Sequence, residues 1–419
     1  MPSKHQWIVS QIGSRQHYGI PRGFESTGQL KRFYTDAWCP RLLGSIFRRG
    51  NASLRGFAAR RHAEVPAGKV ISFNFQAVRD GLAGVYGKPP SMEDGCREFL
   101  RIGKRFDHSV ADDLQRPGRI DPRTDAFFAF NTGALQSLKV LRQLAVPTVL
   151  DQIDPAKVEE DMVFAEAAKW PGWQSLPGRI PQEYWDHMAA EWAAADLVLV
   201  NSQWSREALV RQGLPDGKLC VVPVAYEPQA GPIPLPRRGS GSLTVLWLGG
   251  VNLRKGIPYL IEAAKLLSNT QLKFVVAGPI GISQQAMDTA PPSMTFLGRV
   301  TRDQTDQVYQ SADIFVLPTI SDGFAITQVE AMSKGLPVIT TPNCGQVVTD
   351  GLDGLIVPAA NSHALAEAIA KLDNNRALLA EMSHNAFLRS TQFLLSSQSQ
   401  QIEEALAALK DNHPAPSRS

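Results

Sequence analysis

Short apolar runs, often β-branched, recur along the whole chain, and segments with helical spacing separate them. In the first half, the runs are Trp7–Ile12, Val70–Phe75, Ala126–Phe130, Thr148–Leu150, Leu197–Val200 and Leu219–Val222. In the second half, they are Thr244–Leu248, Phe274–Ala277, Thr295–Leu297, Asp313–Leu317, Val338–Thr341 and Leu355–Val357. Such runs, without polar alternation, are typical of parallel strands that are covered on both faces. The sequence therefore predicts an α/β fold with two doubly wound, Rossmann-like sheets.

A chain of 419 residues is long enough for two domains. The segment 227–242 is rich in Pro, Gly and Ser and lacks apolar periodicity, so it is the expected linker. We expect a first domain over 1–226 and a second over 243–385. A C-terminal helical segment over 386–419 is expected to pack back toward the first domain.

The charge balance and the cysteines exclude several classes of protein. A formal net charge of +3, from 43 basic and 40 acidic residues, does not favour a nucleic-acid binder. The four cysteines lack the spacing of a disulfide framework or a zinc site. No apolar run approaches the ~20 residues of a membrane span. We expect a cytoplasmic protein that requires neither a metal nor another cofactor.

The loop after Thr244–Leu248 has the composition of a phosphate-binding loop. It begins with Gly249 and Gly250, and it carries Arg254 and Lys255 just before a segment of helical spacing. Glycines let the backbone approach a ligand, and cations at a helix start favour a diphosphate. The alternative is a solvated Arg–Lys pair in an ordinary loop.

A second candidate loop follows Asp313–Leu317. It presents Asp322 and Gly323, and a short helix carrying Glu330 is expected to end at Gly335. Carboxylates are good acceptors for the adjacent hydroxyls of a ribose or a sugar. Asp-Gly alone, however, is also a common turn.

These segments together resemble the donor-binding half of the GT-B glycosyltransferases of glycosyltransferase family 4. The similarity covers about Thr244–Leu372 and lies in motifs that follow in order. They are Lys255-Gly256, the run Glu-Ala-Met-Ser-Lys-Gly-Leu-Pro-Val from Glu330, and Asp-Gly-Leu-Asp-Gly-Leu-Ile-Val-Pro from Asp350. The chain departs from the family pattern at Gly250, where an arginine is usual, and at Asp322, where a glutamate is usual.

The resemblance implies a GT-B fold and roles for particular residues. Lys255 would contact the donor diphosphate, and Glu330 would bind the ribose hydroxyls. Because Gly250 stands where the family has an arginine, either Arg254 supplies the second cation or the site has only one. The amides of Phe324 and Ala325 would approach the transferred sugar or its phosphate. The full set of implied donor-site positions is Gly249, Gly250, Arg254, Lys255, Gly298, Val300, Asp322, Gly323, Phe324, Ala325, Ile326 and Glu330. Asp322 and Glu330 are also candidate catalytic residues.

The first half offers fewer candidates for an acceptor site. Gly13, in the loop after the first strand, could meet phosphate or sugar oxygens, or the loop could be an ordinary one. Asp151 and Asp154 follow the strand Thr148–Leu150 and are candidates for positioning or deprotonating an acceptor hydroxyl. Alternatively, either aspartate caps the next segment, since Asp154-Pro155 is typical of a helix start.

The segment 41–62 is basic and amphipathic. It contains six arginines and no acidic residue, with apolar side chains between them. This pattern suits contact with anionic lipid headgroups or with an acidic acceptor. A solvated, locally paired surface is the alternative. Membrane contact would place the protein at the inner face of the membrane.

The sequence therefore predicts a glycosyltransferase that moves a sugar from a UDP-, GDP- or ADP-sugar to a hydroxyl of a glycan, lipid-linked or small-molecule acceptor. The resemblance implies retention of anomeric configuration and no metal requirement. A non-catalytic sugar-nucleotide-binding protein remains an alternative because of Gly250 and Asp322. An oxidoreductase is disfavoured because no G-x-G-x-x-G follows a strand.

Overall fold

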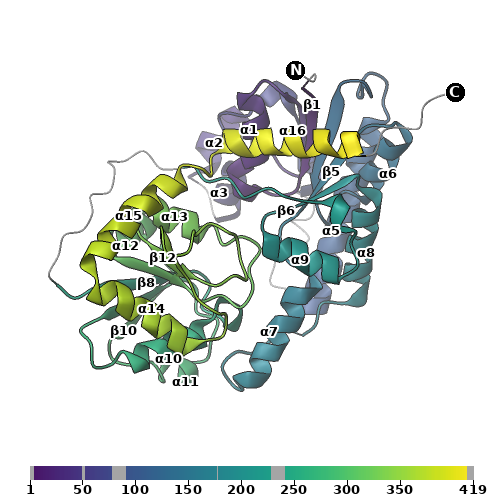
Figure 1. Ribbon diagram of the computed structural model, residues 1–419. Coiled ribbons are helices and arrows are strands. Elements are labelled where there is room, and N and C mark those ends of the chain that lie inside the picture. Colours follow the sequence, from purple (N-terminus) through teal and green to yellow (C-terminus); the bar gives the residue numbers. More distant parts are fainter. Residues whose placement is uncertain (1–3, 50–51, 78–90, 177, 228–240, 413–419) are drawn as a thin grey trace.

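The computed structural model describes residues 4–49, 52–77, 91–176, 178–227 and 241–412, and these residues form two parallel sheets (Figure 1). The first sheet has seven strands in the order β3-β2-β1-β4-β5-β6-β7, and the second has six in the order β10-β9-β8-β11-β12-β13. The strands of the first sheet are β1 (Gln6–Gln11), β2 (Leu30–Thr35), β3 (Val70–Ser72), β4 (Asp125–Phe130), β5 (Thr148–Gln152), β6 (Leu197–Val200) and β7 (Leu219–Val221). Those of the second are β8 (Thr244–Leu248), β9 (Lys273–Ala277), β10 (Met294–Gly298), β11 (Ile314–Leu317), β12 (Val338–Thr340) and β13 (Gly354–Ile356). The predicted fold of two Rossmann-like domains is confirmed.

Helices cover both faces of the first sheet. Successive residues of β1 point to opposite faces, so Ile8 packs beneath one helical layer while Trp7 and Val9 pack beneath the other. One layer contains α5, α6, α8 and α9, and the other contains α1 and the C-terminal α16. The helices of the first half are α1 (Gly19–Ser26), α2 (Arg41–Phe47), α3 (Ala52–Ala58), α5 (Met92–Leu114), α6 (Leu135–Gln143), α7 (Lys157–Lys169), α8 (Gln182–Ala194) and α9 (Gln203–Arg211).

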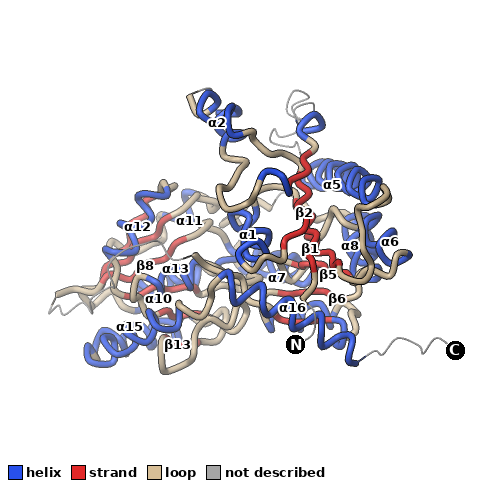
Figure 2. The backbone as a smooth tube through the Cα atoms, turned by 90° about the horizontal axis from the view of Figure 1, so that it is seen from above, coloured by secondary structure: helices blue, strands red, loops and turns tan. Residues whose placement is uncertain are grey.

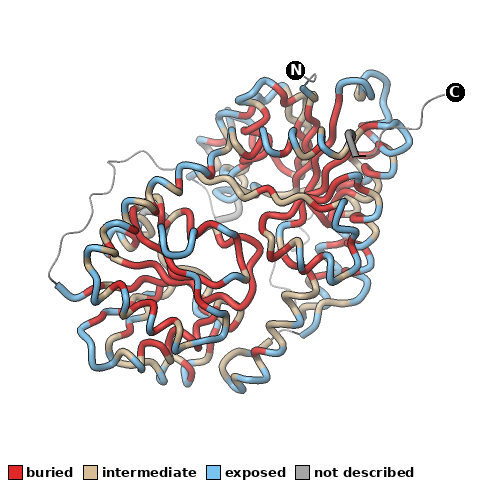
Figure 3. Tube along the Cα trace, viewed as in Figure 1, coloured by how far each residue is buried: buried red, intermediate tan, exposed pale blue. Residues whose placement is uncertain are grey.

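The second sheet is covered in the same way. Trp247 of β8 lies in a core with α10 and α14, while Leu246 faces the opposite core with α12 and α13. The predicted helical face of α10 is buried, as expected from its apolar spacing. The helices of the second half are α10 (Ile257–Leu266), α11 (Gln284–Met287), α12 (Arg302–Ser311), α13 (Thr327–Ser333), α14 (Ser362–Asn374), α15 (Arg376–Ser390) and α16 (Leu395–Asn412). Figure 3 shows buried strands at the centre of both halves.

The C-terminal helix α16 lies across the first domain, against α1 (Figure 1). Glu403 on α16 accepts hydrogen bonds from the Trp7 indole at 2.7 Å and from the Gln29 amide at 3.1 Å. The helix before it, α15, packs on α13 in the second domain. The expected boundary at residue 386 therefore falls inside α15. Most of the expected linker, 228–240, lies outside the described residues.

Helix α7 and the turn after it reach from the first domain onto the second. Gln174 accepts a hydrogen bond from the Leu253 amide at 2.8 Å, and Glu166 accepts one from the Tyr259 hydroxyl at 2.7 Å. The ring of Trp170 meets that of Tyr259 edge-on, with centroids 5.7 Å apart. We call the segment 157–176 the arm. In Figure 1 it runs alongside the lower part of the second domain.

One strand was not predicted. Strand β2 contains Lys31 and Arg32, which break its apolar pattern. Both side chains find partners at the sheet, since Lys31 pairs with Asp125 at 2.6 Å and Arg32 donates to the Arg119 carbonyl at 3.3 Å. Pairing with long-range partners therefore overrides the local pattern. Strand β3 is also shorter than the run predicted at Val70–Phe75.

Candidate functional site

The loop after β8 holds two cations at the carboxyl edge of the second sheet. Asn252 caps a short 3-10 helix, η4 (Leu253–Lys255), by accepting the Lys255 amide at 3.0 Å. Gly256 follows with a positive φ of 73°, and a Cβ there would lie 1.7 Å from the Pro318 carbonyl oxygen. Only glycine permits this close approach of the two loops. The loop after β8 is therefore fixed against the loop after the neighbouring strand, β11.

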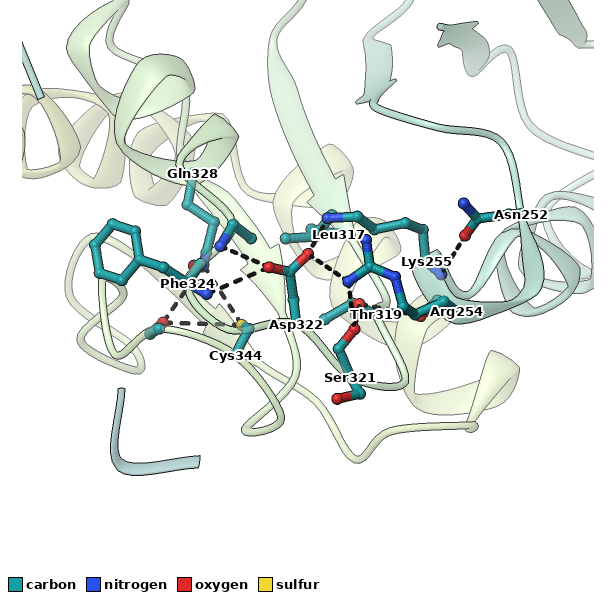
Figure 4. A network of polar contacts seen from close by, with 12 residues as sticks. Asn252, Arg254, Lys255, Leu317, Thr319, Ser321, Asp322, Phe324, Gln328 and Cys344 are labelled. Atoms are coloured by element: carbon teal, nitrogen blue, oxygen red, sulfur yellow. Dashed lines mark hydrogen bonds and ion pairs between the residues drawn. The ribbon is translucent and has the colours of Figure 1, made fainter. Parts of the chain in front are cut away.

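Asp322 is the centre of the polar network at this edge (Figure 4). Its Oδ2 accepts hydrogen bonds from Lys255 Nζ and from Arg254 Nη1, the latter at 3.3 Å. Its Oδ1 accepts the amides of Phe324 at 3.3 Å and Ala325 at 3.0 Å. The two cations and the two amides that the sequence assigned to the donor thus all converge on one carboxylate.

The charges around Asp322 decide its ionisation. Burial alone would raise the pKa of this carboxyl, but Lys255 and Arg254 outweigh that effect and hold the pKa below its usual value. Asp322 is therefore ionised at neutral pH. An anion held by two cations and two backbone amides marks a position that is suited to phosphate oxygens.

Arg254 also connects the two domains. Its Nη1 lies 3.3 Å from Glu159 Oε2 on the arm and 3.2 Å from the Ser321 carbonyl oxygen. The Ser321 hydroxyl donates to Glu159 at 3.0 Å and accepts from the Trp204 indole at 3.0 Å. Burial raises the pKa of Glu159 to about 7, although Arg254 opposes that shift. Glu159, Ser321 and Trp204 had no predicted role, and their contacts span 67 to 162 positions of sequence, beyond any local pattern.

Glu330 lies in the first turn of α13, as predicted, and Gly335 ends that helix with a φ of 71°. Its Oε2 accepts a hydrogen bond from the Tyr309 hydroxyl at 2.9 Å. Asp322 and Glu330 thus have different partners, although both belong to the segment that follows β11. Ile326, immediately before α13, accepts the Glu330 amide at 3.1 Å.

The other predicted donor positions outside the segment after β11 lie at the carboxyl ends of β8 and β10. A Cβ at Gly278, after β9, would lie 1.7 Å from the Gly249 carbonyl oxygen, so these two loops touch through their backbones. Gly298 ends β10 with a φ of 67°, and Val300 follows it, half-buried. Gly250 does not have the left-handed backbone that requires glycine, so its small size alone distinguishes it.

The predicted acceptor residues lie at the carboxyl edge of the first sheet. Burial raises the pKa of Asp151 to about 7; the charge of Arg15 lowers it and that of Asp154 raises it. Asp154 Oδ1 accepts the Ala156 amide at 3.0 Å. The helix that follows, α7, begins at Lys157 and has no side-chain cap, so the predicted alternative role of Asp154 as a helix cap is wrong. Burial also raises the pKa of Asp154.

The Gly13 loop reaches the same place. Gly13 donates its amide to Asp36 at 2.9 Å, and its φ is 83°. The Arg15 guanidinium lies 5.2 Å from the centroid of the Phe130 ring at the end of β4. The next three residues, 16–18, all have positive φ without being glycine, a strained arrangement that clusters at functional sites.

The two edges face each other across a narrow gap. A Cβ at Gly323 would lie 2.1 Å from the Ile153 carbonyl oxygen and 3.0 Å from the Asn201 amide nitrogen. Asn201 itself donates to that carbonyl at 2.7 Å. Ser202, beside it, caps α9 by accepting the Ser205 amide at 3.0 Å. The loop carrying Asp322 is therefore held against the loop that follows Asp151.

The basic segment forms the helices α2 and α3, which project from the first domain (Figure 2). Leu42 is 84% exposed, and Arg41, Arg49 and Arg55 are exposed as well. Arg60, at its far end, pairs with Asp36. Part of the segment, including residues 50–51, lies outside the described residues.

Among the described residues, no three His, Cys, Asp or Glu side chains gather closely enough to hold a metal ion. Within the same residues, no helix combines the length and apolarity needed to cross a bilayer. The four cysteines are free thiols.

The fold and this edge-to-edge arrangement are those of the GT-B class. Across solved structures, the chain superposes on sucrose-phosphate synthase from Thermosynechococcus elongatus with a TM-score of 0.63 at 16% identity, covering 97% of this chain and 99% of that one. It superposes on HepE of Anabaena in complex with UDP-glucose with a TM-score of 0.56 at 14% identity, covering 96% and 100%. These likenesses show the fold.

The match to a protein-family model lies in the second domain. Residues 242–375 match the family model of glycosyl transferases group 1. Over 139 residues the chain is 31% identical to D-inositol 3-phosphate glycosyltransferase of Mycobacteroides abscessus, and the aligned region covers 30% of this chain and 31% of that protein. Over 187 residues it is 33% identical to phosphatidyl-myo-inositol mannosyltransferase of Mycobacterium leprae, and the aligned region covers 42% of this chain and 48% of that protein. The chain thus spans between about a third and a half of the length of these relatives.

Proposed function

We propose that the chain is a glycosyltransferase that takes a sugar from a nucleoside-diphosphate sugar bound in the second domain. The observation that carries the proposal is the convergence of Lys255, Arg254 and the amides of Phe324 and Ala325 on a single anionic position. A diphosphate presents several anionic oxygens, and charge-assisted contacts of this kind are the strong ones. The match of residues 242–375 to glycosyl transferases group 1 supports the same reaction class.

In the proposed complex, the diphosphate lies beside Lys255 and Arg254, and Asp322 moves to hydroxyls of the transferred sugar. Glu330 binds the ribose hydroxyls, and the loops at Gly298 and Val300 flank the base. The cations neutralise the charge that develops on the leaving diphosphate, so that no metal is required for departure. Anabaena HepE, which has the same fold, was solved with UDP-glucose.

The acceptor hydroxyl would approach from the first sheet, where Asp151 and Asp154 lie. A carboxylate with a pKa near 7 is suited to general-base work at neutral pH. We propose retention of configuration by attack on the same face as the departing diphosphate, with the leaving phosphate assisting. The product's anomeric configuration, read by NMR, tests this point, and an inverted product would refute it.

A panel of UDP-, GDP- and ADP-sugars tests the function itself. Released nucleoside diphosphate is measured with and without a mixture of hydroxyl acceptors, in buffer with EDTA and with added Mg²⁺. The proposal expects release from one donor class that acceptors accelerate and EDTA leaves unchanged. Binding of a nucleoside diphosphate with no turnover of any donor would instead favour the non-catalytic alternative.

A further inference from the structure

A cavity of about 330 Å³ lies where the arm meets the second domain. Its walls come from α7, α8 and the loop after β8, and from Gln174, Leu176, Gly178 and Ile180 of the first domain. Most of the wall is apolar, with Val163, Leu176, Trp185 and Met188 among its members. The nucleotide-sugar site described above uses none of these four side chains.

One end of the cavity is polar, and it is part of the candidate active site. Asp154, Glu159 and Arg254 line this end. Arg254 also contacts Asp322, so the cavity and the anionic position share a wall. Tyr184 lines the cavity too, and burial and the charge of Asp154 raise the pKa of its hydroxyl, which therefore remains a neutral donor.

The size of the cavity limits what it accepts. Its volume corresponds to roughly ten water molecules of the liquid, which is room for a ring or a short aliphatic chain. A glycan without an apolar part would leave the aliphatic and aromatic wall facing water. An apolar group of about that size would instead gain the free energy of leaving water.

We propose that this cavity binds the apolar part of the acceptor, so that the acceptor is a hydroxyl compound carrying a ring or a short aliphatic group. The apolar part lies between α7 and α8, and the hydroxyl lies at the polar end, near Asp154 and Arg254. This inference rests on the proposed function for the word acceptor, but the binding of the apolar group can be measured without any donor.

The test is calorimetric titration of the full-length protein with methyl, butyl, octyl and dodecyl β-D-glucopyranosides below their micelle concentrations. Affinity is expected to rise about fourfold for each methylene that enters the cavity, and to level off once the cavity is full. Affinity that does not depend on chain length would overturn the proposal. Affinity that still rises by the same factor for each methylene beyond the roughly ten that the cavity can hold would point to an open lipid-binding surface and would also overturn it.

A pair of variants on α7 locates the effect. Val163→Trp fills the cavity from a half-buried position, whereas Ala165→Trp places the same ring on the exposed side of the helix. We expect Val163→Trp to abolish the chain-length dependence and Ala165→Trp to keep it. Equal behaviour of the two variants would contradict the assignment.

Nucleoside-diphosphate binding, titrated in the same three proteins, separates this inference from the proposed function. If the wild-type protein binds the nucleoside diphosphate but its affinity for the glucosides does not depend on alkyl chain length, the cavity assignment alone is overturned. If the wild-type protein binds no nucleoside diphosphate, the proposed function is overturned, while the glucoside titrations still decide what the cavity binds.

Discussion

Replacing Lys255 with alanine should weaken nucleotide binding strongly. Lys255 Nζ points at the Asp322 carboxylate, the position we assign to a phosphate oxygen. Two unit charges about 4 Å apart interact by about 4 kcal/mol at an effective dielectric constant of about 20. Because Asp322 and water compete with the phosphate for the same cation, we expect the substitution to cost about half of that interaction energy, roughly 2 kcal/mol of binding free energy. This cost corresponds to about a thirtyfold loss of affinity.

The assay is calorimetric titration with whichever of UDP, GDP and ADP binds the wild-type protein most tightly. Lys255→Arg keeps the charge and should stay within a few-fold of wild type. Lys265→Ala removes one charge from a surface pair with Glu262 on α10 and should not change the affinity. Thermal unfolding confirms that Lys255→Ala is folded, since Asp322 keeps Arg254 and two amides as partners.

If Lys255→Ala and Lys265→Ala bind nucleotide as tightly as wild type, the reasoning is refuted, because the cation would then lie away from the diphosphate. Equal losses in both variants would also refute it. That result would show an effect of net charge rather than of a built site.

Four further predictions follow from single positions. Glu330→Ala should weaken nucleoside-diphosphate binding while inorganic pyrophosphate binds as before, since only the ribose contact is lost; equal weakening of both in titrations would contradict the ribose role. Gly250→Arg should tighten nucleotide binding several-fold, since it adds a cation where the backbone does not require glycine; unchanged titration curves would mean that Arg254 already fills this role. Asp151→Asn should raise the free energy of unfolding in urea more at pH 8 than at pH 5. Burial raises the pKa of Asp151 from about 4 to about 7, so the wild-type protein loses stability as the pH rises through that window and the buried carboxyl ionises, whereas the amide does not ionise. A difference in unfolding free energy between variant and wild type that does not change with pH would contradict this prediction. Gly323→Ala should slow turnover and expand the molecule in small-angle scattering, since its Cβ would meet the Ile153 carbonyl at 2.1 Å; an unchanged radius of gyration would show that the contact yields without domain opening.

The sequence predicted most of the fold because its signals are local. Buried parallel strands are short apolar runs, and α10 and α13 carry helical spacing and a terminal glycine. Strand β2 was not predicted because Lys31 and Arg32 interrupt its apolar pattern, and their hydrogen-bond partners lie about 90 positions away in the sequence. No local pattern reports such partners.

The candidate site was predictable only as a set of loops. Lys255, Arg254 and Asp322 were singled out from their motifs, but their convergence on one another depends on the contact between the loops after β8 and β11. The contact of Glu159 with Arg254 could not be predicted, because Glu159 reaches the site from the arm and lies 95 positions from Arg254 in the sequence. Gly323 was predicted as a donor-site residue, whereas the structure also packs its backbone against the Ile153 carbonyl of the first domain.

The most direct test of the central claim is a crystal structure of the chain with its tightest-binding nucleoside diphosphate. We predict a phosphate oxygen within hydrogen-bonding distance, about 3 Å, of Lys255 Nζ, and ribose hydroxyls of the same nucleotide within hydrogen-bonding distance of Glu330. A nucleotide bound elsewhere, or one that touches only one of these two side chains, would contradict it.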